Sequence, residues 1–272
     1  MNLKTLKLIA IFSMLFDHML RIFPLHKLLL PVASNLEVIY PAHGELICNL
    51  LLDTLPTILM FVGRLAAPVF MFCIANGYMH TSNIKRYLLR IFCFAALAQI
   101  PYILFFQAEA KVLGTEITPY EVNLNILFTL GLGLLAITCF ERFKQNNRLI
   151  GFVSVLLIAL FAKLIKTEGS EGYILIVFMF YLLKDVSKPK QAWVWIGVIL
   201  LSRWKLLLWL SDDFDSAWRS TLLNTVGAYL GILLTFYYNG RKGNINKVLQ
   251  YGFYWFYPIH LLLLAAIGFI II

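Results

Sequence analysis

Long apolar runs constrain this chain more than any other feature of its sequence. A helix needs about 20 mostly apolar residues to cross a bilayer, and about nine such stretches can be read along the 272 residues. They cover roughly 4–23, 58–79, 88–106, 122–140, 149–165, 171–184, 191–210, 218–238 and 249–271. Only 14% of the residues are charged, against about 25% in soluble domains. The sequence therefore predicts an all-α, polytopic integral membrane bundle with about nine transmembrane helices.

Positive charge predicts how the chain is oriented in the membrane. If the N-terminus is cytoplasmic, most of the 23 Lys and Arg residues fall on the inner side and most of the 14 Asp and Glu residues on the outer side. Short cytoplasmic loops carry an excess of Lys and Arg, so we predict an N-in, C-out topology. The net charge of +9 is spread over short clusters between apolar runs. Membrane orientation explains this charge, and no nucleic-acid partner is predicted.

The connectors leave no room for a separate soluble domain, so residues 1–272 are expected to form a single transmembrane domain. The longest connector, 24–57, is rich in leucine and has prolines at positions 24, 31, 41 and 56. We place it outside, where a re-entrant or interfacial segment would fit its composition.

Ionisable residues inside the apolar runs are the strongest functional signal. Each costs roughly 2.5–3.5 kcal/mol at a helix centre, so function or pairing must justify it. Asp17 and His18 lie side by side in the first run, and Arg64 lies in the second. Pro68 cannot donate a hydrogen bond to the Arg64 carbonyl, so we expect a kink there. His260 lies in the last run, where Pro258 is expected to break the helix just before it.

These polar residues are predicted to lie at a similar depth in the membrane. At 1.5 Å of rise per residue, five of them lie roughly 17–20 Å from the inner ends of four spans. They are Asp17, His18, Arg64, Gln99 and His260. Scattered structural residues have no reason to share a layer, so we predict one buried polar site. Three further residues are expected to line its substrate pocket: Asn123, Asn125 and Tyr257.

Simpler explanations exist for each of these charges. Arg21 lies four residues after Asp17 and could neutralise it locally. Arg64 could extend outward to the membrane interface. His260 could be a neutral histidine that is hydrogen-bonded to a neighbouring helix.

Familiar ligand-binding motifs are absent from the sequence. The four cysteines show no CxxC spacing and do not cluster with histidine, so no metal site is predicted. There is no GxGxxG or Walker motif, so side-chain charge would have to hold any phosphate-bearing donor. A basic cluster on the inner side could do this, although orientation in the membrane also explains most of its charge. The candidate cofactor-binding residues are His80, Lys85, Arg86, Arg90, Arg241 and Lys242.

Five sequence blocks, in this order, resemble the TraX family, which is named for the acetylase of F-type conjugative pilin. They are LKLIAIFSMLFDHM, GRLAAPVFMFCIANGYMHTSNIKRYLLR, NLNILFTLGLGLL, YNGRKG and YGFYWFYPIHLLLL. The resemblance covers nearly the whole chain. It implies a multi-pass acyltransferase of the bacterial inner membrane that uses acetyl-CoA, or another acyl-CoA, from the cytosol.

The resemblance also assigns residues. The family's Asp-His pair corresponds to Asp17 and His18, its Gly-Arg to Gly63 and Arg64, and its Pro-x-His to Pro258 and His260. The chain departs from the family at Gln99, where many members have Glu, so we do not expect this position to act as a base.

Acyl transfer from a thioester requires a base for the acceptor and a donor to the oxyanion. We expect His18 to be the base, Arg64 to stabilise charge or anchor the thioester, and His260 to be a second acid/base or a structural partner. Neighbours on a helix project about 100° apart, so Asp17 is expected to pair with Arg64 rather than to orient His18. The acceptor would be an amine or hydroxyl on an exported or membrane-presented peptide, glycan or lipid. The alternatives are a proton-coupled transporter and a non-catalytic assembly factor of a secretion or conjugation system.

Overall fold

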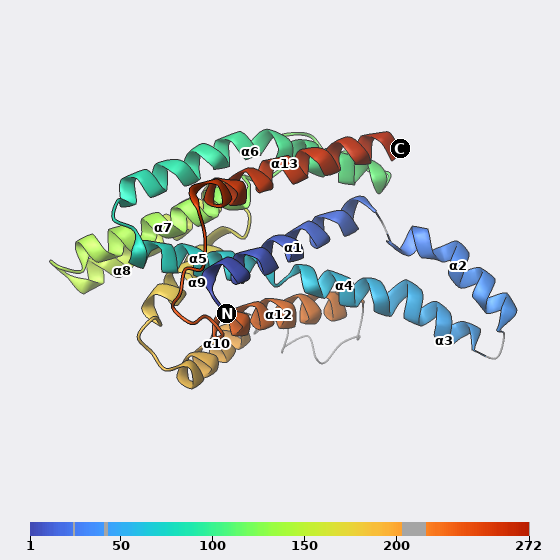
Figure 1. The fold of residues 1–272 in the computed structure, drawn as a ribbon, viewed down its shortest axis with the longest axis horizontal. Coiled ribbons are helices and arrows are strands. Elements are labelled where there is room, and N and C mark those ends of the chain that lie inside the picture. The colour runs from blue at the N-terminus through green and yellow to red at the C-terminus, as the bar shows by residue number, and fades with distance from the viewer. Residues whose placement is uncertain (24, 41–42, 203–215, 272) are drawn as a thin grey trace.

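The apolar runs fold into helices throughout the described part of the chain (Figure 1). The computed structural model describes residues 1–23, 25–40, 43–202 and 216–271. Four expected spans correspond closely to α1 (Leu3–Ile22), α8 (Arg148–Leu164), α9 (Ser170–Leu182) and α13 (Lys247–Ile271). Three more correspond with shifted ends to α6 (Ile84–Val112), α7 (Ile126–Phe143) and α12 (Ser216–Thr235). The expected span at 191–210 begins as α10 (Lys188–Ser202), and its remainder, 203–210, lies outside the described residues.

Prolines act differently in two of the spans. The second expected span is divided into α4 (Leu55–Gly63) and α5 (Ala66–His80), which confirms the kink predicted at Arg64. The prediction at Pro258 was wrong, because α13 continues through this residue without interruption. Proline is tolerated inside membrane helices where neighbouring groups satisfy the backbone that it frees.

Helix length and composition support a membrane protein. Among the described residues, four helical stretches are long and apolar enough to cross a bilayer: Phe61–His80, which includes the break between α4 and α5, Ile84–Val112, Ile126–Phe143 and Lys247–Ile271. The count of nine spans and the N-in orientation remain predictions.

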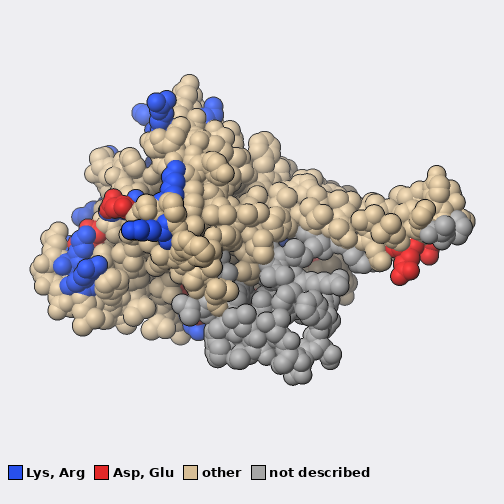
Figure 2. All heavy atoms as spheres, turned by 90° about the horizontal axis from the view of Figure 1, so that it is seen from below, with Lys and Arg blue, Asp and Glu red and all other residues tan. Residues whose placement is uncertain are grey.

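The described residues of the connector, 25–40 and 43–57, form a helical arm that extends away from the bundle (Figure 1). It contains α2 (Leu25–Ile39), α3 (Gly44–Cys48) and the π-helical turn η1 (Asn49–Thr54), which leads directly into α4. Helix α2 packs back against α3 and η1. Its large apolar side chains are largely exposed, with Val38 at 80% and Leu28 at 57%. Figure 2 shows acidic side chains on this arm, and both basic and acidic side chains on the bundle.

Packing in the bundle brings the first and last helices together. Helix α13 lies along α6, and α1 packs against α4, α5 and α13. Buried side chains from α1, α6 and α13, including Ile22, Phe105 and Leu261, form one apolar cluster. The last turns of α1 therefore lie against α6 and α13.

Candidate functional site

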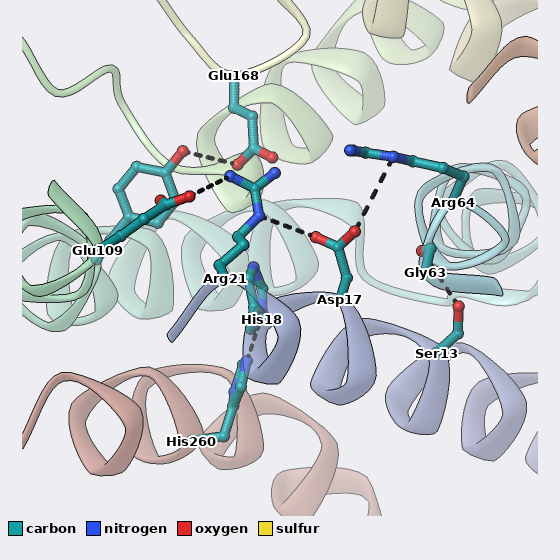
Figure 3. Close-up of polar contacts among 10 residues, drawn as sticks. Ser13, Asp17, His18, Arg21, Gly63, Arg64, Glu109, Glu168 and His260 are labelled. Atoms are coloured by element: carbon teal, nitrogen blue, oxygen red, sulfur yellow. Dashed lines mark hydrogen bonds and ion pairs between the residues drawn. The ribbon is translucent and has the colours of Figure 1, made fainter. Parts of the chain in front are cut away.

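Two histidines from opposite ends of the chain meet in the bundle. The Nδ1 atom of His18 on α1 lies 2.9 Å from the Nε2 atom of His260 on α13, as Figure 3 shows. The ring of Phe105 packs edge-on against His18, with centroids 5.0 Å apart. On the other side, Phe256 stacks on His260 at 4.7 Å. Tyr257, a predicted pocket residue, is buried beside His260.

The hydrogen-bond chain determines which nitrogen of each neutral ring carries the proton. His260 Nδ1 lies 2.8 Å from the carbonyl oxygen of Phe256. A carbonyl oxygen only accepts, so His260 Nδ1 must be the donor and His260 Nε2 the acceptor. His18 Nδ1 then donates to His260, which leaves the lone pair of His18 on its Nε2 atom. His18 is therefore the ring with a basic nitrogen that takes no part in these hydrogen bonds and is available to accept a proton.

Asp17 forms ion pairs with two arginines. Its Oδ2 atom lies 3.2 Å from Nε of Arg21, and its Oδ1 atom lies 3.9 Å from Nε of Arg64. The pairing predicted with Arg64 and the local alternative with Arg21 are therefore both present. Arg64 occupies the break between α4 and α5, next to Gly63. A Cβ atom on Gly63 would lie 2.6 Å from the Cβ and Oδ1 atoms of Asp17, so glycine permits this close approach.

Two carboxylates that sequence reasoning missed also lie at this centre (Figure 3). Glu109 of α6 accepts from Nη1 of Arg21 at 3.2 Å. Glu168, in the loop between α8 and α9, accepts from the Tyr102 hydroxyl at 3.1 Å. Burial raises the pKa of Glu168, whereas Tyr102 and Arg21 act in the opposite direction.

A sequence signal existed for only one of these carboxylates. Glu109 follows Tyr102 by seven residues, so both lie on one face of a helix. The predicted span ended at residue 106, however, whereas α6 continues to Val112. Glu168 lies outside any apolar run and has no comparable pattern.

Gln99 forms a separate cluster with the predicted pocket residues of α7. Its side-chain amide donates to the Asn123 carbonyl at 3.1 Å, and its oxygen accepts from the Asn125 backbone and side chain at 3.0 and 2.8 Å. Asn125 is buried and also caps α7, accepting from the Leu127 N–H. This cap explains why α7 begins four residues later than predicted.

A second polar region lies near the N-terminus, where α1, α5, α6 and α13 meet. It is a cavity of about 260 Å³ that contains three of the predicted cofactor-binding residues, His80, Arg90 and Lys242. Sequence reasoning missed other residues that line it, among them Lys7, Asn76, Tyr87, Gln250 and Tyr254. The other predicted cofactor-binding residues, Lys85, Arg86 and Arg241, are exposed nearby and are not among the lining residues.

Arg90 is the most constrained cation of this cavity. Its guanidinium lies 5.7 Å from the ring centre of Tyr87 and 5.3 Å from that of Tyr254. Its Nε atom is buried and has no hydrogen-bond partner among the described residues. A buried donor without a partner is costly, and an anionic ligand in the cavity would satisfy it.

Comparison with known proteins decides the family. Residues 2–268 match the family model described as TraX protein. The chain belongs to the TraX family. It is also 28% identical over 211 residues to a protein of Dichelobacter nodosus named probable fimbrial assembly protein FimC, serogroup H1, covering 76% of this chain and 82% of that protein. No solved structure matches.

The TraX motifs in this sequence lie around one centre in three dimensions. The Asp-His motif, the Gly-Arg motif and the Pro-x-His motif are far apart along the chain, yet Asp17 contacts Gly63 and Arg64, and His18 contacts His260. The cavity near the N-terminus contains residues from the later part of the long block that begins with Gly63 and Arg64, and from one further block, YNGRKG.

Proposed function

We propose that this TraX-family protein is a bacterial inner-membrane acyltransferase. It would move an acetyl group from cytosolic acetyl-CoA to an amine or hydroxyl of an exported or membrane-presented acceptor. The name of the Dichelobacter relative further suggests an acceptor or partner in pilus or fimbria assembly. The observation that carries the proposal is the His18–His260 pair, with its tautomers fixed by the Phe256 carbonyl.

His18 would act as the general base through Nε2. It would take the proton of the acceptor N–H or O–H while that nitrogen or oxygen attacks the thioester carbonyl. A new C–N or C–O bond forms, the C–S bond breaks, and the same proton passes from His18 to the departing thiolate. His260 would hold His18 in the reactive tautomer, as a carboxylate does in other catalytic dyads.

Arg64 would stabilise the oxyanion of the tetrahedral intermediate. It lies beside Asp17 at the helix break, where the small residue Gly63 lets the two helices approach closely. A cation held in position before the reaction stabilises developing charge without reorganisation.

The basic cavity near the N-terminus would bind the phosphates of the donor, with Arg90, Lys242 and His80 as ligands. Lys85, Arg86 and Arg241 would attract the anion from the surface. Lys7 and His18 lie on the same helix, eleven residues apart, which corresponds to about 16 Å. A pantetheine arm is about as long as five residues of extended chain, or roughly 17 Å, so a donor held in the cavity would reach His18.

This arrangement depends on the predicted orientation. Reporters fused after Lys85, Arg142 and Lys242 are expected to be cytoplasmic, and those after Lys111 and Thr167 external. An external signal after Lys85 would place the cavity on the wrong side of the membrane for cytosolic acetyl-CoA.

The direct test is acetyl transfer by purified protein. Radiolabelled acetyl-CoA is incubated with the protein and with extracts that contain candidate acceptors. Wild type should label an acceptor, and His18→Ala should lower the rate by about 10²–10⁴-fold while donor binding is retained. Unchanged turnover in both His18→Ala and His260→Ala would refute the catalytic role of the histidine pair, whereas a wild-type protein that labels no acceptor would favour a proton-coupled transporter.

A non-catalytic assembly factor is the second candidate, because the Dichelobacter relative is named for fimbrial assembly. In that case wild type would label no acceptor, and substitutions at His18 would alter folding or partner binding only.

A further inference from the structure

The loop between α8 and α9 returns into the bundle and places one carboxylate at the reaction centre. Backbone bonds join Leu124 to Lys166 at 3.0 Å and Glu168 to Leu124 at 2.8 Å. The hydroxyl of Thr129 donates to the Glu168 carbonyl at 2.6 Å. These bonds restrain the loop and so fix the position of the Glu168 side chain.

The described charged groups of the centre include more carboxylates than guanidinium groups. Its described charged groups are Asp17, Arg21, Arg64, Glu109 and Glu168, and its neutral titratable groups are His18, His260, Tyr102 and Tyr257. The two guanidinium groups contact the carboxylates of Asp17 and Glu109. Glu168 instead accepts from the neutral phenol of Tyr102 and from the backbone of Ile126, and the charge of Arg21 acts on it through the electrostatic field. The described groups thus carry one negative charge in excess.

We infer that Glu168 stabilises the imidazolium that forms on His18 when it takes the acceptor's proton. The inference rests on the proposed function. In the resting state His18 is neutral and the described groups carry this excess negative charge; after proton transfer the charges of the described groups balance. Glu168 acts through the electrostatic field rather than through contact with substrate, and is therefore a positioning residue.

The test compares two glutamates that lie three residues apart. Glu168→Gln keeps an oxygen that can accept from Tyr102 but removes the charge. Glu171→Gln is the matched control, because Glu171 lies in the same region and pairs with Lys163 at 2.9 Å, where Lys163 is 64% exposed. Both variants are purified, and their melting temperatures are compared with wild type to show that they fold.

Glu168→Gln should lower kcat by about tenfold, the order of effect that one buried charge has on another at an effective dielectric of about 20. The KM for acetyl-CoA should not change. The acid limb of the pH–rate curve should move to lower pH, because His18 loses its proton more readily without the carboxylate. Glu171→Gln should match wild type. Equal kcat and equal acid limbs in the two variants would overturn the inference.

A second measurement does not depend on catalysis. Histidine-labelled protein is titrated by NMR, and the His18 signals are assigned with His18→Ala. The titration midpoint of His18 should fall to lower pH in Glu168→Gln and stay in place in Glu171→Gln. A wild-type protein without transferase activity would refute the proposed function, whereas an unmoved midpoint in Glu168→Gln would refute the role of Glu168.

Discussion

The two polar regions of this bundle differ in whether carboxylates neutralise their positive charges. At the His18 centre, Arg21 and Arg64 contact the Asp17 carboxylate, and their side chains are only 31% and 30% exposed. In the cavity near the N-terminus, Arg90 lies between tyrosine rings, and the described lining residues include no carboxylate. The first arrangement fixes charges in place before a reaction. The second leaves positive charge available to an anionic ligand.

This contrast predicts different consequences of mutation. Changes at the His18 centre should reduce turnover or stability, because they disturb groups that neutralise one another. Changes in the cavity should weaken donor binding and leave the chemical step intact. The predictions below test this division, beginning with the largest expected effect.

Arg64→Lys should lower kcat by about a hundredfold. A lysine keeps the charge but cannot reproduce the directed hydrogen bonds of a guanidinium held at a helix break. Steady-state acetyl transfer measures the effect, and Arg86→Lys, at an exposed position, is the control. Wild-type activity in Arg64→Lys would show that charge alone suffices at this position.

Gly63→Ala should destabilise the protein by about 1–3 kcal/mol and reduce activity as well. The added Cβ would lie 2.6 Å from the Asp17 side chain, which would have to move. Gly252→Ala is a suitable control, since a Cβ there meets nothing within 4 Å, and alanine is the better helix former. Thermal melting in detergent compares the two, and equal stability would mean that Asp17 can move without cost.

Arg90→Gln should raise the KM for acetyl-CoA by about tenfold with little change in kcat, as loss of one charge-assisted contact to a phosphate predicts. Lys85→Gln, whose side chain is exposed and does not line the cavity, should change KM less. A fall in kcat without a change in KM would place Arg90 with the His18 centre and remove the distinction between the two regions.

Glu121→Gln should have the smallest effect, because Glu121 belongs to neither region. Its carboxylate accepts from the backbone and hydroxyl of Thr118, both at 2.7 Å, and these bonds lower its pKa. A carboxyl whose folded pKa is depressed stabilises the fold above its unfolded pKa, and this contribution is lost as pH falls through the folded value. The melting temperatures of wild type and variant should therefore differ slightly at neutral pH and converge in acid. A difference that grows in acid would contradict this account.

The sequence by itself determined the helices and the presence of a polar site. Apolar length predicts a membrane helix, and the high cost of burying Asp17, His18, Arg64 and His260 means that they must find partners. Depth along each span placed these residues at one level. Helix rise is a local property of the backbone, so the sequence is sufficient for this step.

Only the tertiary structure decided which partners meet. His18 and His260 are 242 residues apart, and no local pattern specifies how α1 and α13 are rotated against each other. Gln99 shares the predicted layer, yet it faces Asn125 on α7 instead of His18. Glu168 reaches the centre through a loop that is anchored by backbone hydrogen bonds, and such bonds carry no side-chain signature. Height in the membrane follows from counting residues, whereas the direction a side chain faces depends on how every neighbouring helix packs.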